Sequence, residues 1–176
     1  RSSLHWPVVT GGRCGRAPAL DIGGKRVRLR DFFDSASVKL ELAATTKDEI
    51  LRELVGLLGL DEKSQAILFK TIKRRENLGS TGIGRNIAIP HCRSLVVNRL
   101  RLAYGRKLSG LEFSSIDGEP ARHFFLIVAP PLEVSNQYLP VLGKIAQFAK
   151  EPDVPDKLSE LKDPEEFLRL LGERAP

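Results

Sequence analysis

Apolar residues recur at helical spacing in two stretches of the first half of the chain. Thr46 and Glu49 form a capping-box pattern, in which each side chain bonds a backbone amide at the other residue. The apolar positions that follow are Ile50, Leu51, Leu54, Leu57 and Leu58. Gly59 ends this helix, and the spacing of apolar residues predicts a second helix from about Asp61 to Glu76.

Alternation and short apolar runs predict the strands. Residues 37–42 and 100–104 alternate as half-buried strands do, and the latter suits a strand with one face in water. Residues 87–89 are a short apolar strand, whereas 124–128 are uninterrupted and therefore typical of a strand covered on both faces. A short amphipathic turn is expected at 29–33. After Pro131 helices are expected over 139–148, 153–162 and 164–171. Because helices and strands alternate, the pattern predicts a layered α/β domain.

Composition narrows the class of protein. The 176 residues, 41% of them hydrophobic, suit one compact domain with a full core. No apolar run approaches the roughly 20 residues of a membrane-spanning helix, so we expect no direct membrane insertion. The first twenty residues lack the apolar centre of a secretory signal. Cys14 and Cys92 form no metal-spaced cluster, and a reducing, cytoplasmic setting is expected.

The formal net charge of +6 is unevenly distributed. Residues 1–30 hold seven Lys or Arg against one Asp, which accounts for the whole excess. Since phosphate-backbone binding needs a clustered positive face on the folded part, we expect no nucleic-acid partner, and binding through this basic segment is the least favoured function. We interpret residues 1–24, rich in Gly, Arg, Ser and Pro, as a disordered leader or a fusion remnant, and residues 25–176 as the domain.

The segment GSTGIGRNIAIPH, residues 79–91, is the most informative stretch of the chain. Its glycines can adopt positive φ and bring backbone N–H groups close to an anion. It lacks the Gly-Lys-Ser/Thr ending of a P-loop, and its glycines precede a strand instead of opening a helix as in a dinucleotide-binding motif. A plain tight turn would also account for the glycines.

His91, which follows Pro90 at the end of this segment, is the candidate reactive residue. A neutral imidazole has a nitrogen lone pair that can attack a phosphoryl group and later release it. From spacing alone, a hydrogen-bonded structural histidine is the favoured alternative. His123 opens the strand at 124–128 and is interpreted as structural. Cys92 is either a small buried apolar residue, the favoured role, or a redox-sensitive thiol.

The segment closely resembles the active-site segment of the enzyme IIA domains of the fructose–mannitol–nitrogen type, from the bacterial phosphotransferase system. Arg75-Glu76, the stretch FSSIDGEP at 113–120, and the strand and helix after it also follow the order of this family. The resemblance extends from about residue 29 to residue 171. The loop is most similar to the nitrogen-regulatory branch, and fructose-type domains share much of it.

The resemblance implies a three-layer α/β/α sandwich around a mixed β-sheet. It also implies that His91 is phosphorylated on Nε2 by an HPr-like phosphocarrier protein, with an enzyme IIB or a regulated target as the next partner. Neither a metal nor a cofactor is required, because donor and acceptor are both proteins without nucleotide. Two functions remain open: a phosphohistidine carrier, and a docking module in which phosphorylation is only a switch or has been lost.

A phosphoryl group on His91 needs donors for its charged oxygens. The backbone amides near Gly82 and Gly84 and the hydroxyls of Ser80 and Thr81 could supply them.

Three further residues are weighed against the family pattern. Arg75 matches an active-site arginine of the family, or it is an ordinary solvated residue at a helix end. Arg85, where members often have Asn, helps the phosphate or faces water. Tyr138 stands where the family usually has a second active-site histidine, or it is an aromatic residue that packs under the helix. Tyrosine can donate one hydrogen bond but carries no positive charge, so onward donation to a sugar-specific partner is in question.

Overall fold

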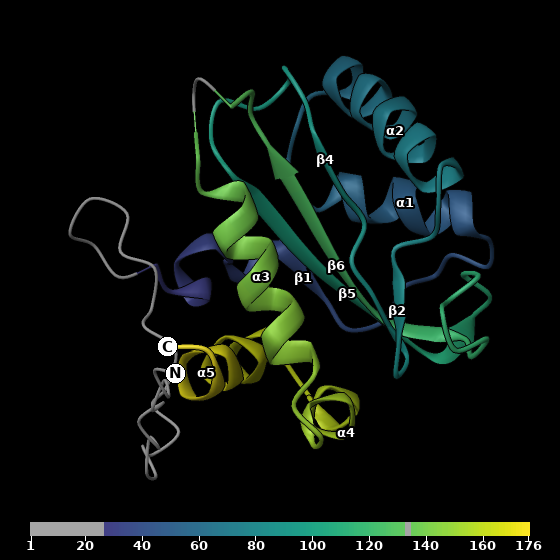
Figure 1. Ribbon diagram of the computed structural model, residues 1–176, viewed down its shortest axis with the longest axis vertical. Coiled ribbons are helices and arrows are strands. Elements are labelled where there is room, and N and C mark those ends of the chain that lie inside the picture. The colour runs from purple at the N-terminus through teal and green to yellow at the C-terminus, as the bar shows by residue number, and fades with distance from the viewer. Residues whose placement is uncertain (1–26, 133–134) are drawn as a thin grey trace, which may run out of the picture.

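The computed structural model describes residues 27–132 and 135–176, so the interpretation of residues 1–24 lies outside the described residues. The described chain builds one mixed sheet with helices on both sides (Figure 1). Its strands are β1 (Val38–Lys39), β2 (Gly82–Gly84), β3 (Ile87–Ala88), β4 (His91–Arg93), β5 (Arg101–Leu111) and β6 (Ala121–Ala129). The helices are α1 (Lys47–Gly56), α2 (Glu62–Asn77), α3 (Tyr138–Ala149), α4 (Val154–Glu160) and α5 (Pro164–Arg174), with 3-10 turns η1 (Leu29–Phe32) and η2 (Ser35–Ser37).

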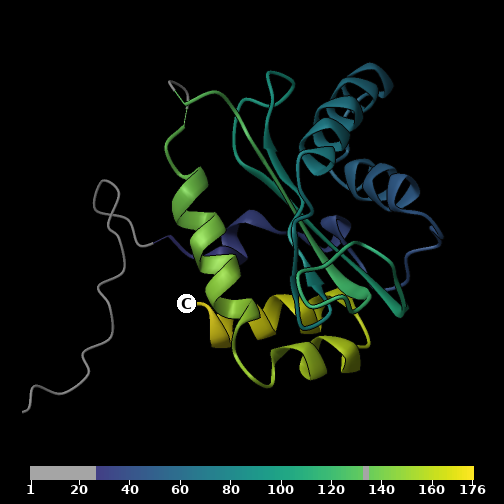
Figure 2. The same ribbon diagram turned by 45° about the vertical axis from the view of Figure 1, so that its right-hand side comes forward.

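The sheet order is β1-β5-β6-β3-β2, and β4 also pairs with β6. β6 runs parallel to β3 and β4 and antiparallel to β5. Helices α1 and α2 cover one face, and α3, α4 and α5 cover the other, as the second view makes clear (Figure 2). The expected three-layer α/β/α sandwich around a mixed sheet is confirmed.

The central strand β6 shows why the sandwich forms. Phe124, Leu126 and Val128 lie in the core under α1 and α2. The alternate residues Phe125 and Ile127 lie in the core under α3 and α5. An uninterrupted apolar run therefore supplies both faces of the sheet, as its sequence predicts.

Two helix starts are capped by side chains, and the capping box predicted at Thr46 forms in part. The Thr46 hydroxyl accepts a hydrogen bond from Glu49 N (3.2 Å), and Asp61 Oδ1 accepts one from Ser64 N (2.6 Å). The return contact of the Glu49 carboxylate goes to Thr45 N (2.8 Å), one residue earlier than the capping-box pattern specifies. This carboxylate and that of Asp61 accept backbone N–H bonds, which lower the pKa of both groups.

Two strand predictions were wrong in part. The strand expected at 37–42 is reduced to β1, because Ser37 belongs to the capping box of η2 with Asp34. The single wet face expected at 100–104 is absent, since residues 102–106 are all buried. β5 lies inside the sheet between β1 and β6, where helices cover both of its faces. In the described part of the chain, none of the helices is long and apolar enough to cross a membrane.

Candidate functional site

Pro90 separates β3 from β4 without ending the ladder to β6. Ala88 pairs with Phe124 and His91 with Ile127, so the register continues across the break. Pro90 has no N–H to donate, but its carbonyl accepts a hydrogen bond from Ile127 N (2.9 Å). His91 therefore opens β4 at a fixed position on the sheet instead of ending the preceding strand.

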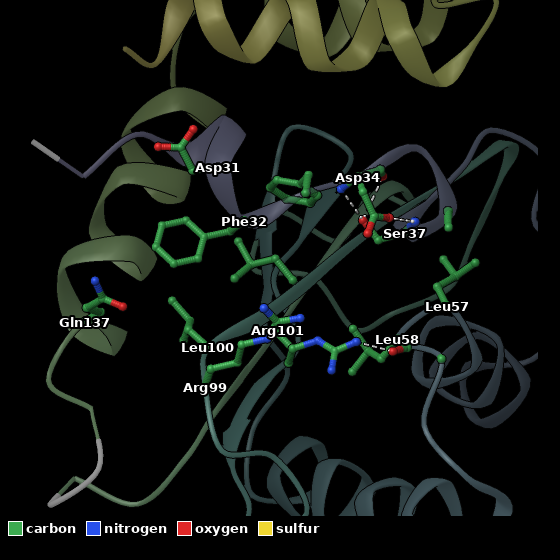
Figure 3. Close-up of a pocket in the computed structure, with 14 residues that line it drawn as sticks. Asp31, Phe32, Asp34, Ser37, Leu57, Leu58, Arg99, Leu100, Arg101 and Gln137 are labelled. Carbon is green, nitrogen blue, oxygen red and sulfur yellow. Dashed lines mark hydrogen bonds between the residues drawn. The ribbon is translucent and has the colours of Figure 1, made fainter.

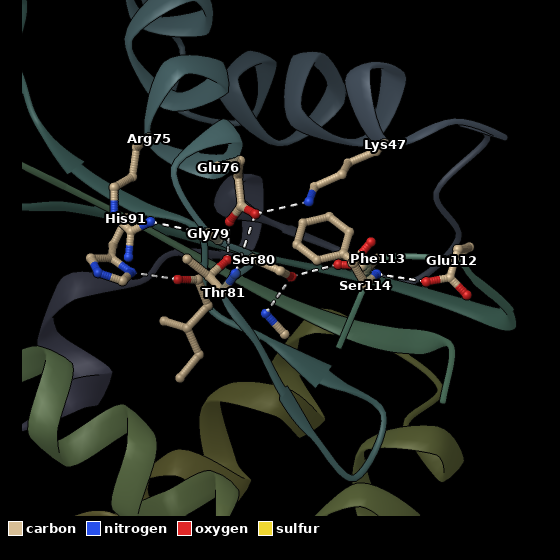
Figure 4. A network of polar contacts seen from close by, with 12 residues as sticks. Lys47, Arg75, Glu76, Gly79, Ser80, Thr81, His91, Glu112, Phe113 and Ser114 are labelled. Atoms are coloured by element: carbon tan, nitrogen blue, oxygen red, sulfur yellow. Dashed lines mark hydrogen bonds and ion pairs between the residues drawn. The ribbon is translucent and has the colours of Figure 1, made fainter. Parts of the chain in front are cut away.

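The imidazole of His91 is half-buried, and one of its two nitrogens contacts a backbone carbonyl (Figure 4). Its Nδ1 lies 2.6 Å from the carbonyl oxygen of Ile89. Because a carbonyl can only accept, Nδ1 is the nitrogen that carries the hydrogen, and in a neutral imidazole the lone pair is then on Nε2. No group in residues 27–132 or 135–176 forms a hydrogen bond to Nε2. This arrangement suits a nucleophilic nitrogen.

Arg75 approaches the histidine from the last turn of α2. Its Nη1 donates to Gly79 O (3.0 Å), which fixes the side chain against the start of the glycine loop. Figure 4 shows the guanidinium beside the His91 ring. The structure thus places Arg75 next to His91, the two residues that the sequence analysis names as candidates for the active site.

Tyr138, the first residue of α3, lies near His91. The two ring centroids are 6.1 Å apart, with an angle of 48° between the planes. Burial raises the pKa of Tyr138 to about 12, so its hydroxyl remains a hydrogen-bond donor near neutral pH. The tyrosine therefore faces the histidine, and it does so from a half-buried position.

Arg93 is a member of this group that the sequence analysis missed. Its guanidinium carbon lies 4.7 Å from the centroid of the Tyr138 ring, and its Nη1 donates to Pro130 O (2.7 Å). The sequence contained a signal for Arg93, because residues two apart on a strand, such as His91 and Arg93, lie on the same face. Cys92 between them is buried in the core under α1 and α2, so His91 and Arg93 project from the opposite face of β4.

The hydroxyls of Ser80 and Thr81 are engaged with protein groups (Figure 4). Ser80 Oγ donates to Phe113 O and accepts from Gly82 N (3.1 Å). Thr81 Oγ1 donates to the buried carboxylate of Glu76, which also accepts from Thr81 N (3.2 Å) and pairs with Lys47 Nζ (3.1 Å). As placed, both hydroxyls hold the glycine loop to α2 and to the segment after β5.

Steric constraints explain why glycine occupies positions 82 and 84. A Cβ on Gly82 would lie 2.3 Å from Ser115 Oγ and 2.8 Å from Ser115 Cα, so only glycine fits there. Gly84 begins a left-handed turn with φ of 87°, which continues through Arg85 (φ 57°) and Asn86 (φ 66°). The loop thus turns sharply and lies close against the chain near Ser115.

Arg85 is exposed, as one of the two expectations had it, and its guanidinium binds backbone carbonyls instead of contacting the histidine. Its guanidinium donates to the carbonyls of Ala149 (3.2 Å), Lys150 (2.5 Å), Glu151 (2.9 Å) and Pro152 (3.1 Å). These carbonyls form the C-terminal end of α3 and the residues just after it, where backbone acceptors lack helical partners. Arg85 therefore caps α3 at the end opposite Tyr138.

His123 is structural, as expected. Its ring is buried, with Nδ1 2.9 Å from the Tyr104 hydroxyl and Nε2 3.3 Å from Ser159 Oγ. Burial, together with the charges of Arg106 and Arg122, lowers the pKa of His123 to about 4. Cys92 is also buried, and burial raises the pKa of its thiol to about 12. The thiol therefore packs in the core as a small apolar side chain. Among the described residues, no group of three His, Cys, Asp or Glu could hold a metal ion.

A pocket of about 600 Å³ opens between the η1–η2 segment, the end of α1 and the start of β5 (Figure 3). Its wall includes Phe32, Leu100, Arg99 and Gln137, and the guanidinium of Arg101 donates to Leu58 O at one side. None of the proposed site residues lines it. The candidate site is therefore the surface around His91, not this pocket.

Comparison with known proteins identifies the family. Residues 31–174 match the family model described as "Phosphoenolpyruvate-dependent sugar phosphotransferase system, EIIA 2". The chain belongs to this family. Membership gives this EIIA domain a phosphocarrier or regulatory role in the phosphotransferase system. One relative is the fructose-specific EIIABC component of Bacillus subtilis, 26% identical over 84% of this chain; the chain spans only 23% of that longer protein.

Solved structures agree with the assignment. The nitrogen regulatory protein IIA-Ntr of Neisseria meningitidis is 25% identical, with a TM-score of 0.71 over 81% of this chain and 98% of that one. Enzyme IIA-mannitol of Escherichia coli, solved in complex with phosphorylated enzyme IIB-mannitol, has the same fold with a TM-score of 0.66 at 21% identity, over 81% of this chain and 98% of that one. The EIIA domain therefore shares its fold with both the nitrogen-regulatory and the sugar-specific branches.

Proposed function

We propose that His91 accepts a phosphoryl group from an HPr-like phosphocarrier protein, and that the domain passes this group to an enzyme IIB or signals with it to a regulated target. The observation that carries the proposal is the hydrogen bond from Nδ1 to Ile89 O, which leaves the Nε2 lone pair available. In the transfer, Nε2 forms a bond to phosphorus while the donor's N–P bond breaks, and the electron pair of that bond returns to the donor nitrogen. No metal or cofactor takes part.

Charge rearranges at both ends of the imidazole during this step. The ring becomes positively charged as Nε2 bonds phosphorus, and Ile89 O stabilises the hydrogen that stays on Nδ1. The arriving group carries close to two negative charges. Arg75, held by Gly79 O beside the ring, offsets part of this charge without any proton transfer. Ser80, Thr81, Gly82 and Gly84 support the phosphoryl group indirectly, because their contacts set the shape of the loop that positions Arg75.

Exposed leucines beside the site provide a docking face. Leu95, Leu132 and Leu139 are 88%, 66% and 69% exposed. Each lies within two residues of Arg93, Pro130 or Tyr138 in the sequence. Apolar side chains clustered at a reaction centre are typical of protein–protein interfaces. The structural neighbour solved with phosphorylated enzyme IIB supports an enzyme IIB as one occupant.

The same proposal places the protein in the cytoplasm, with no nucleic acid among its partners. Its support is the family, together with the buried free thiol of Cys92. The remaining alternative is a docking module that uses the same leucines and in which phosphorylation is only a switch or has been lost.

Phosphorylation by purified components tests the proposal. The protein is incubated with phosphoenolpyruvate, enzyme I and an HPr-like carrier, and its intact mass is measured. We expect a gain of one phosphoryl group in the wild type and in His5→Ala, and none in His91→Ala. If the wild type gains no mass with a carrier that phosphorylates another EIIA domain, the carrier function is refuted and docking alone remains.

A further inference from the structure

Arg93 connects three parts of the site. From β4 it donates to Pro130 O, just after the end of β6, and it stacks on Tyr138, the first residue of α3. These two contacts lie at opposite ends of the connection between β6 and α3. One side chain thereby fixes where the connection begins and where it ends. The position of the Tyr138 ring relative to His91 depends on both contacts.

The Tyr138 ring lies close to both a cation and the reactive histidine. Arg93 is 4.7 Å from the ring centroid, a distance at which a guanidinium is attracted to the aromatic face. The His91 ring is 6.1 Å away. Within the described residues the Tyr138 hydroxyl has no hydrogen-bond partner, although its ring contacts Arg93 and lies near the His91 ring. A half-buried phenol donor without a protein acceptor can serve an acceptor that arrives later.

We propose that Arg93 is a positioning residue for phosphoryl transfer: by stacking on Tyr138 and bonding Pro130 O, it holds the tyrosine hydroxyl as a hydrogen-bond donor to the phosphoryl group on His91. This inference rests on the proposed phosphorylation of His91. In this inference Tyr138 donates the hydrogen bond that stabilises phospho-His91, and Arg93 contributes only by positioning Tyr138. The loop hydroxyls of Ser80 and Thr81 are engaged with protein groups, so Tyr138 adds a hydroxyl donor to the charge that Arg75 supplies.

The test measures the equilibrium between the phosphorylated carrier and the EIIA domain. At equilibrium the affinity of docking cancels, so the phosphorylated fraction reports the stability of phospho-His91 itself. A hydrogen bond to a charged oxygen changes such an equilibrium by roughly tenfold, and we expect about that loss in both Tyr138→Phe and Arg93→Gln. Arg93→Lys keeps the charge but not the planar stacking and should recover only part of the loss. Arg99→Gln, which removes an exposed arginine from the adjoining loop, is the matched control and should leave the equilibrium unchanged.

A double variant separates positioning from charge. If Arg93 acts through Tyr138, Arg93→Gln in the Tyr138→Phe background changes the equilibrium less than about threefold, because the donor is already gone. If the full tenfold effect persists in that background, Arg93 acts by charge alone and the positioning role is refuted. The phosphorus-31 chemical shift of phospho-His91 provides a second readout, which should move alike in Tyr138→Phe and Arg93→Gln.

Two outcomes distinguish this inference from the proposed function. If the wild type is never phosphorylated, the proposed function fails and the inference fails with it. If the wild type and Arg93→Gln reach the same phosphorylated fraction with the same chemical shift, the proposed function stands and the role of Arg93 is refuted. Circular dichroism and a thermal melt establish that each variant is folded before it is compared.

Discussion

Lowering the pH from 7.5 to 4.5 should destabilise the EIIA domain through His123. In the folded protein this ring is buried among Tyr104, Ser159 and the charges of Arg106 and Arg122, and its pKa is lowered to about 4. In the unfolded chain a histidine has a pKa of about 6.5. Between these two values the unfolded state binds the proton and the folded state does not. Stability is therefore complete above about pH 6.5 and is lost as the pH falls towards 4.

The size of the loss follows from the two pKa values. At pH 4.5 the proton linkage of His123 should cost about 2.5 kcal/mol of the free energy of unfolding relative to pH 7.5. For a domain of this size that corresponds to a drop of roughly 5–10 °C in melting temperature. The exposed carboxylates whose pKa is lowered by backbone bonds, such as Asp61 and Asp117, lose their contribution mainly at lower pH.

Urea denaturation at a series of pH values measures the effect, with His123→Gln as the control. Glutamine retains hydrogen-bonding groups but does not titrate, so its curve should lack the decline between pH 6.5 and 4.5. The comparison uses the slopes with pH, since the substitution also lowers stability at neutral pH. Parallel curves for wild type and His123→Gln would show that the buried ring does not control acid stability, and the reasoning from burial would be wrong.

Three other substitutions probe the framework of the site. Glu76→Ala leaves Lys47 and the Thr81 donors without their buried acceptor and should cost about 3–5 kcal/mol in urea denaturation, with Glu76→Gln costing less. Gly82→Ala should cost about 1–3 kcal/mol in the same assay, because its Cβ meets Ser115; a neutral effect would show that the loop moves freely. Arg85→Ala should lower the melting temperature but preserve the mass gain on phosphorylation, and loss of that gain would contradict its role as a remote helix cap.

Local patterns predicted the elements whose determinants are local. The helices that begin after Thr46 and Asp61 depend on caps within three residues, and β6 depends on its own apolar run. The wet face expected at 100–104 is absent for a nonlocal reason, because β5 lies between β1 and β6 and helices cover both faces of the sheet. Farther along the same strand a charged residue is buried, also for a nonlocal reason. Arg106 on that strand is buried because its guanidinium donates to Leu158 O (2.9 Å) and Leu161 O (2.8 Å), carbonyls at the end of α4. A charged residue in a strand pattern predicts an exposed position, unless backbone carbonyls far away in the sequence accept its hydrogen bonds.

The candidate site shows the same division. The motif located His91, and strand periodicity would have located Arg93, since both follow from neighbours in the sequence. The bond partners of the loop could not be predicted, because Ser80 contacts the carbonyl of Phe113, 33 residues away, and Arg85 contacts α3 more than 60 residues away. The pattern of small and polar residues in the loop predicts phosphate donors, which stays a prediction; what it could not predict is that the hydroxyls of Ser80 and Thr81 bond to protein groups.

These long-range contacts connect α3 to the histidine segment at both ends. Arg85, in the turn between β2 and β3, holds the carbonyls at the C-terminal end of the helix. Arg93, on β4, holds Tyr138 at its N-terminal end. His91 lies between these two arginines in the sequence, so the segment that carries it is attached to α3 on both sides of the histidine. A partner that docks on Leu139, the second residue of α3, therefore contacts a helix whose two ends are both attached to the segment that carries His91.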